Sequence, residues 1–440
     1  MMIVPRGSTA RTYSSWFSRF ERQARISEWA VAGGSTMSAG MDALRQQEAV
    51  SKYLPSPAKI PKSVGLSFSG GGYRATLFHL GALRRLNEFG ILPKLTTISS
   101  VSGGSILNGF LASRLRAPLA GGIADFQDGV SQPMRDFCSL NIRKWIALEV
   151  AVPGTHNSLS LAKQYDQHLT SGKLLRQIPD TPLHVFCATD LACGVDWMFK
   201  RQQCGDYQVG FLDTPADWRV STAVAASSCF PPVFKPLNLD LDPSILTPGE
   251  IPEGAQRDKC IRELTLSDGG VYDNLGLEPI WKDHKIVLCS DGGALFRVGG
   301  DAGFVWEVDR FISIPENQAL AVRKRWLISN FVAKQLKGTY WGIGSTAYDY
   351  GVRQGYSNDL AQNYISAIRT DLDKFSDAEA SILENHGYWL ADAAIRKYVP
   401  ELLPTNIPPL KVPHADWEGP EEKIKEALKD SGKRTLLGRS

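Results

Sequence analysis

The chain has 440 residues, a length that at about 150 residues per domain permits two or three domains, or one α/β domain with insertions. Hydrophobic residues make up 43% and charged residues 22%, which excludes a mostly disordered, collagen-like or coiled-coil protein. The net charge of +3 is too small for the electrostatic footprint of a nucleic-acid-binding protein, so we expect no nucleic-acid partner.

Cysteine usage and hydropathy indicate the compartment. The seven cysteines are odd in number and scattered, without the CxxC or Cys/His spacing of a metal site, so we expect reduced thiols and no bound metal. No run of 18 apolar residues indicates a transmembrane helix, and the start lacks the apolar core of a secretory signal. The sequence therefore predicts a cytoplasmic protein that needs no cofactor.

Residues 1–61 are predicted to form a peripheral N-terminal leader and linker. The first 30 residues contain five arginines together with Trp16, Phe17, Phe20 and Trp29. This composition is typical of a basic amphipathic helix on a membrane surface, but a loosely ordered leader is the favoured interpretation because chain termini are commonly loose. Peripheral membrane contact and a dispensable leader both stay open.

The first chemical motif is a glycine loop between a strand and a helix. The apolar run 64–68 leads to Ser69, Gly70, Gly71 and Gly72, and then to a helical pattern with leucines on one face. Glycines at a helix N-terminus leave backbone N–H groups bare, and the helix dipole favours negative charge there. The loop therefore suits an oxyanion or a phosphate. A dinucleotide site would also want an acidic residue at a strand end, which is missing here.

A second strand-to-helix turn follows at residues 95–104. It contains Ser100-Val101-Ser102-Gly103-Gly104, which is typical of a nucleophile elbow except that Ser100 replaces the first glycine. In such an elbow the serine hydroxyl is exposed on a sharp turn. Because the two turns would end neighbouring parallel strands, Ser102 and the glycine loop are predicted to share one edge of a sheet.

An acyl-transfer site also needs a group that takes the serine proton. Two strand ends downstream each deliver a carboxylate before a glycine pair, Asp268-Gly269-Gly270 and Asp291-Gly292-Gly293. Spacing alone does not separate Asp268 from Asp291.

Together, the loop Ser69–Arg74, the Ser102 elbow and the turn Asp268–Asn274 resemble the motifs of the patatin-like phospholipase family, in the family's order. Residues 187–191 and 225–234 resemble two further stretches of that family. The resemblance spans about residues 62–295 and departs from the pattern at Ala75 and Ser100, both small residues in place of glycine. It implies an α/β fold with a central, largely parallel sheet flanked by helices.

The resemblance also implies the chemistry. It assigns a Ser/Asp dyad that hydrolyses acyl esters of lipids such as phospholipids, with Ser102 as nucleophile and Asp268 as base. The sequence after Asp268 continues as in the family, and this favours it over Asp291. The oxyanion hole would be Gly71, Gly72 and Gly103, and the remaining motif positions are Gly70, Ser100, Gly104, Gly269 and Gly270.

Two rival interpretations remain. Chain order permits a Ser-Asp-His triad with His386 or His414, as in a histidine-assisted esterase or acyltransferase of another fold. Neither histidine lies in a glycine-marked loop at a strand end, and His386 falls in a helical pattern, so a structural role is favoured for it. A lipid-binding module with a decayed catalytic site is the second rival.

The rest of the chain carries no motif. The catalytic core is predicted over residues 62–300, in which residues 118–175 are expected to be loop-rich and to form either a lid or a further layer of core. Residues 301–440 are predicted to be a mainly helical C-terminal extension packed on the core, with a charged tail. Arg74 is expected either to add positive charge near the oxyanion or to be solvated.

Overall fold

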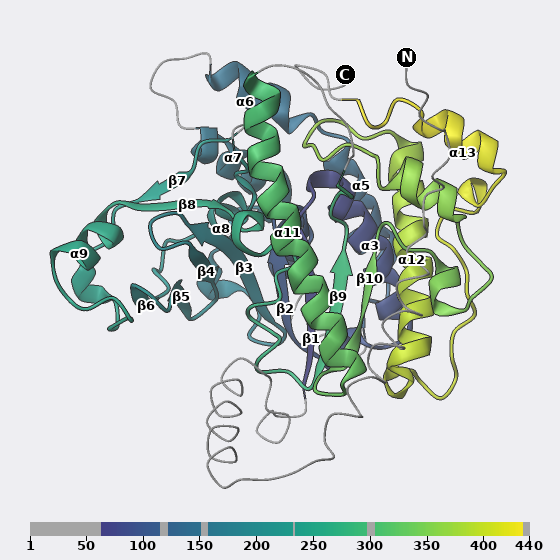
Figure 1. Cartoon of the computed structure of the whole chain (residues 1–440), viewed down its shortest axis with the longest axis horizontal. Coiled ribbons are helices and arrows are strands. Elements are labelled where there is room, and N and C mark those ends of the chain that lie inside the picture. The colour runs from purple at the N-terminus through teal and green to yellow at the C-terminus, as the bar shows by residue number, and fades with distance from the viewer. Residues whose placement is uncertain (1–62, 115–121, 151–156, 232–233, 297–303, 434–440) are drawn as a thin grey trace, which may run out of the picture. The chain divides into compact units, whose positions relative to one another are not determined.

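The computed structural model describes residues 63–114, 122–150, 157–231, 234–296 and 304–433 (Figure 1). The predicted leader, residues 1–61, lies outside these ranges. None of the helices in the described ranges combines the length and the apolar character needed to span a bilayer.

One sheet organises the described residues and contains ten strands. Strands β10, β9, β1, β2 and β3 lie side by side in this order and run parallel, whereas β4, β5 and β6 continue from β3 as antiparallel hairpins. Strand β8 pairs antiparallel with β3 and with β7. The strands are β1 (Val64–Phe68), β2 (Leu95–Val101), β3 (Leu183–Asp190), β4 (Val195–Phe199), β5 (Gln203–Asp206), β6 (Gly210–Asp213), β7 (Leu237–Leu239), β8 (Leu264–Asp268), β9 (Ile286–Asp291) and β10 (Lys337–Gly342).

Helices connect these strands and cover the sheet. Figure 1 shows the long helix α11 running across the sheet in front of β2 and β9. The helices are α3 (Gly72–Glu88), α4 (Gly103–Arg114), α5 (Gln132–Cys138), α6 (Ile142–Val150), α7 (Asn157–Tyr165), α8 (Val220–Ser228), α9 (Ala255–Arg262), α10 (Gly270–Asp273), α11 (Phe304–Val332), α12 (Asp377–Tyr398) and α13 (Glu421–Leu428). The α/β class with a largely parallel, helix-flanked sheet is thus confirmed.

The parallel strands are largely buried on both faces because helices cover both. On β1 and β9, Phe68 and Leu288 belong to the main hydrophobic core, to which α3 and α12 contribute. The alternate residues of β9, Val287 and Cys289, lie in a second cluster with Leu327 of α11. Side chains of β9 that alternate along the strand therefore bury themselves in two different cores.

Helices α3 and α12 approach each other closely. A Cβ atom at Gly81 would lie 1.8 Å from the carbonyl oxygen of Glu384, and one at Gly387 would lie 1.9 Å from that of Phe78. Only glycine fits at these two crossing points. The nearly complete burial of α12 explains why its sequence is rich in small and apolar residues.

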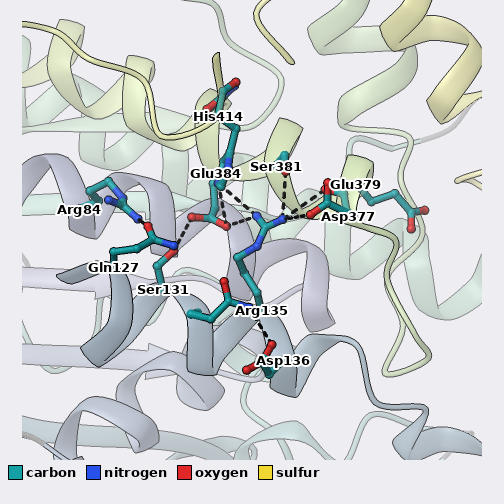
Figure 2. Close-up of polar contacts among 12 residues, drawn as sticks. Arg84, Gln127, Ser131, Arg135, Asp136, Asp377, Glu379, Ser381, Glu384 and His414 are labelled. Carbon is teal, nitrogen blue, oxygen red and sulfur yellow. Dashed lines mark hydrogen bonds and ion pairs between the residues drawn. The ribbon is translucent and has the colours of Figure 1, made fainter. Parts of the chain in front are cut away.

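A buried polar cluster ties α5 to α12 (Figure 2). Glu384, fully buried on α12, accepts hydrogen bonds from Ser131 (2.8 Å) and from Arg135 of α5 (2.5 Å), and His414 lies 3.3 Å from it. Arg135 also donates to Ser381 at 3.0 Å. Burial alone would raise the pKa of Glu384, but His414 and Arg135 together lower it. The carboxylate is therefore held ionised between the two elements.

Two segments contain elements that the sequence did not predict. Strand β10 lies inside the segment predicted to be mainly helical, where it follows α11 and pairs with β9. Its short run of six residues carries two glycines and two aromatics, which gave no alternating pattern. Residues 118–175, expected to be loop-rich, contain α5, α6 and α7 in their described part.

Candidate active site

Ser102 lies in the turn between β2 and α4. Strands β1 and β2 are parallel neighbours, and Phe68 pairs with Ser100 near their carboxyl ends. Both following turns, the glycine loop and the serine turn, therefore lie at the same edge of the sheet. Ser102 has a φ of 50°, the left-handed conformation that non-glycine residues rarely adopt. This is the strained turn expected of a nucleophile elbow.

Glycines let the serine turn approach the preceding strand and loop. A Cβ atom at Gly104 would lie 2.5 Å from the carbonyl oxygen of Phe68, and one at Gly103 would lie 2.1 Å from that of Gly72. Any side chain at either position would push the two turns apart. The two glycines after Ser102 are therefore needed for the close packing of the serine turn against β1 and the glycine loop.

Ser100, which replaces the first glycine of the family pattern, is held by hydrogen bonds to three neighbouring residues. Its buried hydroxyl donates to the carbonyl oxygen of Val185 at 3.1 Å and accepts hydrogen bonds from Ser105 and from Asn108, each at 2.9 Å. The hydroxyl is thus fully satisfied beneath the serine turn. A serine here adds a polar link between β2, β3 and α4.

The first turn of α3 leaves two N–H groups available. The N–H of Tyr73 donates to the carbonyl oxygen of Asp371 (3.0 Å) and that of Ala75 to Gly71 (3.3 Å). No described residue accepts a hydrogen bond from the N–H of Gly71 or Gly72. A Cβ atom at Gly72, where φ is 57°, would lie 2.6 Å from the Asp371 carbonyl oxygen, so this backbone crowds the position.

The first turn of α4 offers a third N–H group. The N–H of Gly104 donates to the carbonyl oxygen of Ser69 (3.1 Å), whereas within the described residues none accepts from Gly103. A Cβ atom at Gly103 would lie 2.8 Å from the backbone nitrogen of Gly72, so the two glycines are adjacent. Free donors from two helix N-termini thus meet beside Ser102.

Asp268 ends β8, which is antiparallel to β3 and pairs Asp268 with Ala188. The residue is 1% exposed, and its Oδ1 accepts the Gly270 N–H at 2.8 Å. Oδ2 is buried without a hydrogen-bond partner in the described residues. Burial raises the pKa of Asp268 to about 7, against the lowering effects of the Gly270 N–H and the Ser102 hydroxyl. The structure thus brings Ser102 and Asp268 together.

The turn after Asp268 also touches the glycine loop through Asn274. The N–H of Gly70 donates to the Asn274 carbonyl oxygen at 3.0 Å. A Cβ atom would lie 2.2 Å from Asn274 Oδ1 at Gly70 and 2.7 Å from it at Gly270. At Gly269 a Cβ would lie 2.4 Å from a carbonyl oxygen of β3. These glycines bring the Asp268 turn against both neighbouring elements.

Asp291, the competing carboxylate, lies in a different environment. Its Oδ2 is 2.5 Å from the Lys324 ammonium and accepts the Tyr340 hydroxyl at 2.7 Å, while Oδ1 accepts the Gly293 N–H at 2.9 Å. Burial alone would raise its pKa, but these three donors lower the pKa to about 2. Both oxygens are occupied, and the carboxylate fixes the end of β9 and the neighbouring helix α11.

Ser227, near the end of α8, joins the two halves of the site. The N–H of Ser102 donates to its carbonyl oxygen (3.1 Å) and to its hydroxyl (3.0 Å). The same carbonyl oxygen accepts the N–H of Gly269 at 3.2 Å. Sequence reasoning noted the stretch 225–234 but assigned Ser227 no role. Its only signal was a run of small residues before two prolines.

The late histidines lie away from this arrangement. His386 is buried on α12 and hydrogen-bonds to the carbonyl oxygen of Ile343 at 2.8 Å, and burial lowers its pKa to about 4. His414 contacts Glu384. Among the described residues, no histidine hydrogen-bonds to either predicted catalytic side chain. The structural role predicted for His386 agrees with this placement.

Arg74 is buried rather than solvated. Its Nε donates to the carbonyl oxygen of Gly292 (3.0 Å) and Nη1 to that of Ile368 (2.8 Å). The guanidinium therefore ties the glycine loop to the turn after β9 and to the segment before α12. The alternative of a solvated Arg74 is therefore wrong. The sequence could not reveal this burial, because the segments that cover Arg74 come from distant parts of the chain.

Within the described ranges, no three histidine, cysteine or acidic side chains are placed to hold a metal ion. The seven cysteines, all described, form no disulfide.

A protein-family model and a curated protein each match a part of this chain. The model of the patatin-like phospholipase family matches residues 66–281, a range that contains the glycine loop, Ser102 and Asp268 but excludes Asp291. A curated protein of Saccharomyces cerevisiae named "Putative meiotic phospholipase SPO1" is 32% identical over 65 residues, which cover 15% of this chain and 10% of that protein.

Two solved structures are similar at low sequence identity. Human GIVD cytosolic phospholipase A2 is 15% identical with a TM-score of 0.34, covering 53% of this chain and 46% of that one. VipD from Legionella pneumophila is 13% identical with a TM-score of 0.32, covering 78% and 69%. The chain thus spans a tenth of the length of the curated relative and less than half of the human enzyme.

Proposed function

Since residues 66–281 belong to the patatin-like phospholipase family, we propose that this chain hydrolyses acyl esters of lipids, phospholipids among them, through an acyl-serine intermediate on Ser102. The observation that carries the proposal is the meeting of three groups at one sheet edge. A strained serine, a buried carboxyl with an unpartnered oxygen, and free backbone N–H groups lie together there. These are the parts that acyl transfer requires.

In the proposed first step Asp268 acts as general base. Its Oδ2 takes the proton of the Ser102 hydroxyl while Oγ attacks the ester carbonyl carbon. The carbonyl oxygen becomes an oxyanion, which accepts hydrogen bonds from the N–H groups of Gly71, Gly72 and Gly103. The tetrahedral intermediate then collapses, and Asp268 returns the proton to the departing alcohol oxygen, which leaves an acyl ester on Ser102.

Water completes the cycle by the same groups. Asp268 takes a proton from a water molecule, whose oxygen attacks the acyl-serine carbonyl carbon, and the oxyanion returns to the same donors. Collapse releases the fatty acid and restores the Ser102 hydroxyl with the proton from Asp268. The raised pKa of Asp268 suits this exchange, because a group with pKa near the working pH both accepts and returns a proton readily.

Ser227 supports this mechanism as a positioning residue. It accepts the Ser102 N–H and the Gly269 N–H on one carbonyl oxygen, so the nucleophile and the base are held to a common point. We also propose that the enzyme works in a reducing compartment on the surface of lipid aggregates. The free cysteines are consistent with a reducing compartment.

The test combines labelling with product analysis. A fluorophosphonate probe should label the wild-type protein at Ser102, identified by peptide mass, and should not label Ser102→Ala. Phospholipid vesicles should release free fatty acid with the wild type only. Labelling without any release would favour a lipid-binding module, and transfer of the acyl group to an added alcohol in place of water would favour an acyltransferase. A labelled Ser102→Ala protein would refute the assignment.

A further inference from the structure

A row of lysines lies at the amino-terminal edge of the sheet, opposite the edge that carries Ser102. The strands β10, β9, β1 and β2 begin in register there, with Lys337, Ile286, Val64 and Leu95 as paired first residues. Lys337 begins β10, while Lys285 and Lys94 immediately precede β9 and β2. Three cations from distant parts of the sequence therefore gather within four adjacent strands.

These lysines line one cavity of about 330 Å³. Ser63, just before β1, and Glu401 complete its polar lining. The cavity size lies at the lower end of the range of small-molecule sites. Three lysines against one glutamate leave an excess of two positive charges in its wall.

The two excess charges belong to Lys94 and Lys285. Lys337, whose side chain is 54% exposed, forms an ion pair with Glu401 at 2.7 Å. The Lys94 ammonium donates to the carbonyl oxygen of Leu402 at 2.7 Å, which anchors its head group at the cavity without neutralising it. Among the described residues no carboxylate forms an ion pair with Lys94 or Lys285.

Such a row has an electrostatic cost in an empty protein. Lys285 and Lys337 stand at the starts of the neighbouring strands β9 and β10, which lie about 4.8 Å apart, and like charges on neighbouring strands destabilise a sheet. Lys94 adds a third positive charge just before β2, which β1 separates from β9. An anion with two negative charges would remove this repulsion and would accept hydrogen bonds from both ammonium groups. Lysine is a frequent phosphate ligand, and a phosphate dianion offers several acceptor oxygens.

We propose that this cavity binds a phosphate dianion, through Lys94 and Lys285 with support from Lys337. The phosphate is either that of a soluble phosphate compound or the phosphomonoester headgroup of a lipid. The site does not depend on the proposed hydrolase activity, since it lies at the opposite edge of the sheet. Its exposed lysines make binding salt-dependent.

The test uses the full chain and two probes. Inorganic pyrophosphate is titrated by calorimetry at low salt, and binding to phosphatidylcholine vesicles with and without phosphatidic acid is measured by co-sedimentation. The variant Lys94→Gln/Lys285→Gln should bind at least about tenfold more weakly, because two charge-assisted hydrogen bonds are lost. Lys282→Gln is the matched control, since this lysine is three positions from Lys285 but is paired with Glu278 outside the cavity.

The outcomes separate the two phosphate sources. Lysine-dependent binding of pyrophosphate assigns a soluble phosphate, and lysine-dependent binding to phosphatidic acid vesicles alone assigns a lipid headgroup. Both variants should melt no lower than the wild type and should keep its turnover of a soluble ester, which shows that they fold. If neither probe binds, or if the double variant and Lys282→Gln bind as the wild type does, the proposal is overturned.

Discussion

Asp268 and Asp291 end strands of the same sheet and precede the same glycine pair, yet the fold gives them opposite electrostatics. Asp268 is buried with one oxygen unpartnered, and its pKa is raised to about 7. Asp291 is equally buried but is paired with Lys324, and its pKa is lowered to about 2. Local sequence therefore does not determine the role of such a turn; the residues that arrive from elsewhere determine it.

The difference arises from what faces each strand end. Asp268 lies beside the serine turn, where the small residues of α8 bring no charge. Asp291 faces α11, which brings Lys324, and β10, which brings the Tyr340 hydroxyl. An unpartnered carboxyl can accept a proton during a reaction, whereas an ion-paired one stabilises the fold.

The largest expected difference is in turnover. Asp268→Asn should lower kcat by about 10⁴-fold, because it keeps the shape but removes the base, as replacing a catalytic carboxylate typically does. Asp291→Asn should stay within about threefold of the wild type. Initial rates on a soluble ester, with folding checked by circular dichroism, measure both. The reverse ranking would make Asp291 the base, and two active variants would refute the dyad.

Stability should change in opposite directions. The lowered pKa of Asp291 gives stability that is present above its ordinary pKa near 4 and lost as the pH falls towards 2. Asp291→Asn should therefore cost on the order of 2 kcal/mol at pH 8, since it leaves the partly exposed Lys324 without its partner.

The raised pKa of Asp268 has the opposite sign. Its stabilising contribution is present below the ordinary pKa and is lost as the pH rises through about 7. Asp268→Asn removes a buried charge and should gain on the order of 2 kcal/mol at pH 8. Urea denaturation of both variants at pH 8 measures the two changes, and a loss of stability in Asp268→Asn would contradict the proposed environment.

Much of the fold and of the candidate active site could be predicted from the sequence. The two strand-turn-helix units and the sharp turn at Ser102 follow from glycine placement and apolar runs, which are local properties, and the largely parallel sheet was implied by the resemblance to the patatin-like phospholipase family. The buried Arg74, the ion pair between Asp291 and Lys324, and the tie at Ser227 all join residues that are distant in the chain. Periodicity carries no information on such pairs, and β10 was missed because its glycines and aromatics do not alternate.

The pH dependence of the reaction sharpens the comparison further. Since Asp268 must be ionised to accept a proton, kcat/KM should fall about tenfold per pH unit below about pH 7 and level off above it. Asp291 is ionised throughout that range, so Asp291→Asn should show the same profile. A profile that keeps its plateau down to pH 5 would exclude Asp268 as the titrating base.

A smaller effect than at Asp268 is expected at Ser227, which contacts the Asp268 half of the site. Ser227→Ala removes the hydroxyl that accepts the Ser102 N–H at 3.0 Å and pairs with Ser105 at 2.8 Å. The carbonyl oxygen stays, and it still accepts the N–H groups of Ser102 and Gly269.

Because one of two acceptors remains, kcat should fall only about tenfold, equivalent to about 1.4 kcal/mol, with KM little changed. The matched control is Ser228→Ala, whose hydroxyl bonds to Tyr165 and to the Val224 carbonyl oxygen and leaves the Ser102 N–H untouched. Steady-state kinetics at pH 8, together with the pH profile, separates positioning from simple destabilisation. A positioning role predicts a lower kcat with an unchanged apparent pKa near 7, whereas equal losses in both variants would mean that α8 only packs against the site.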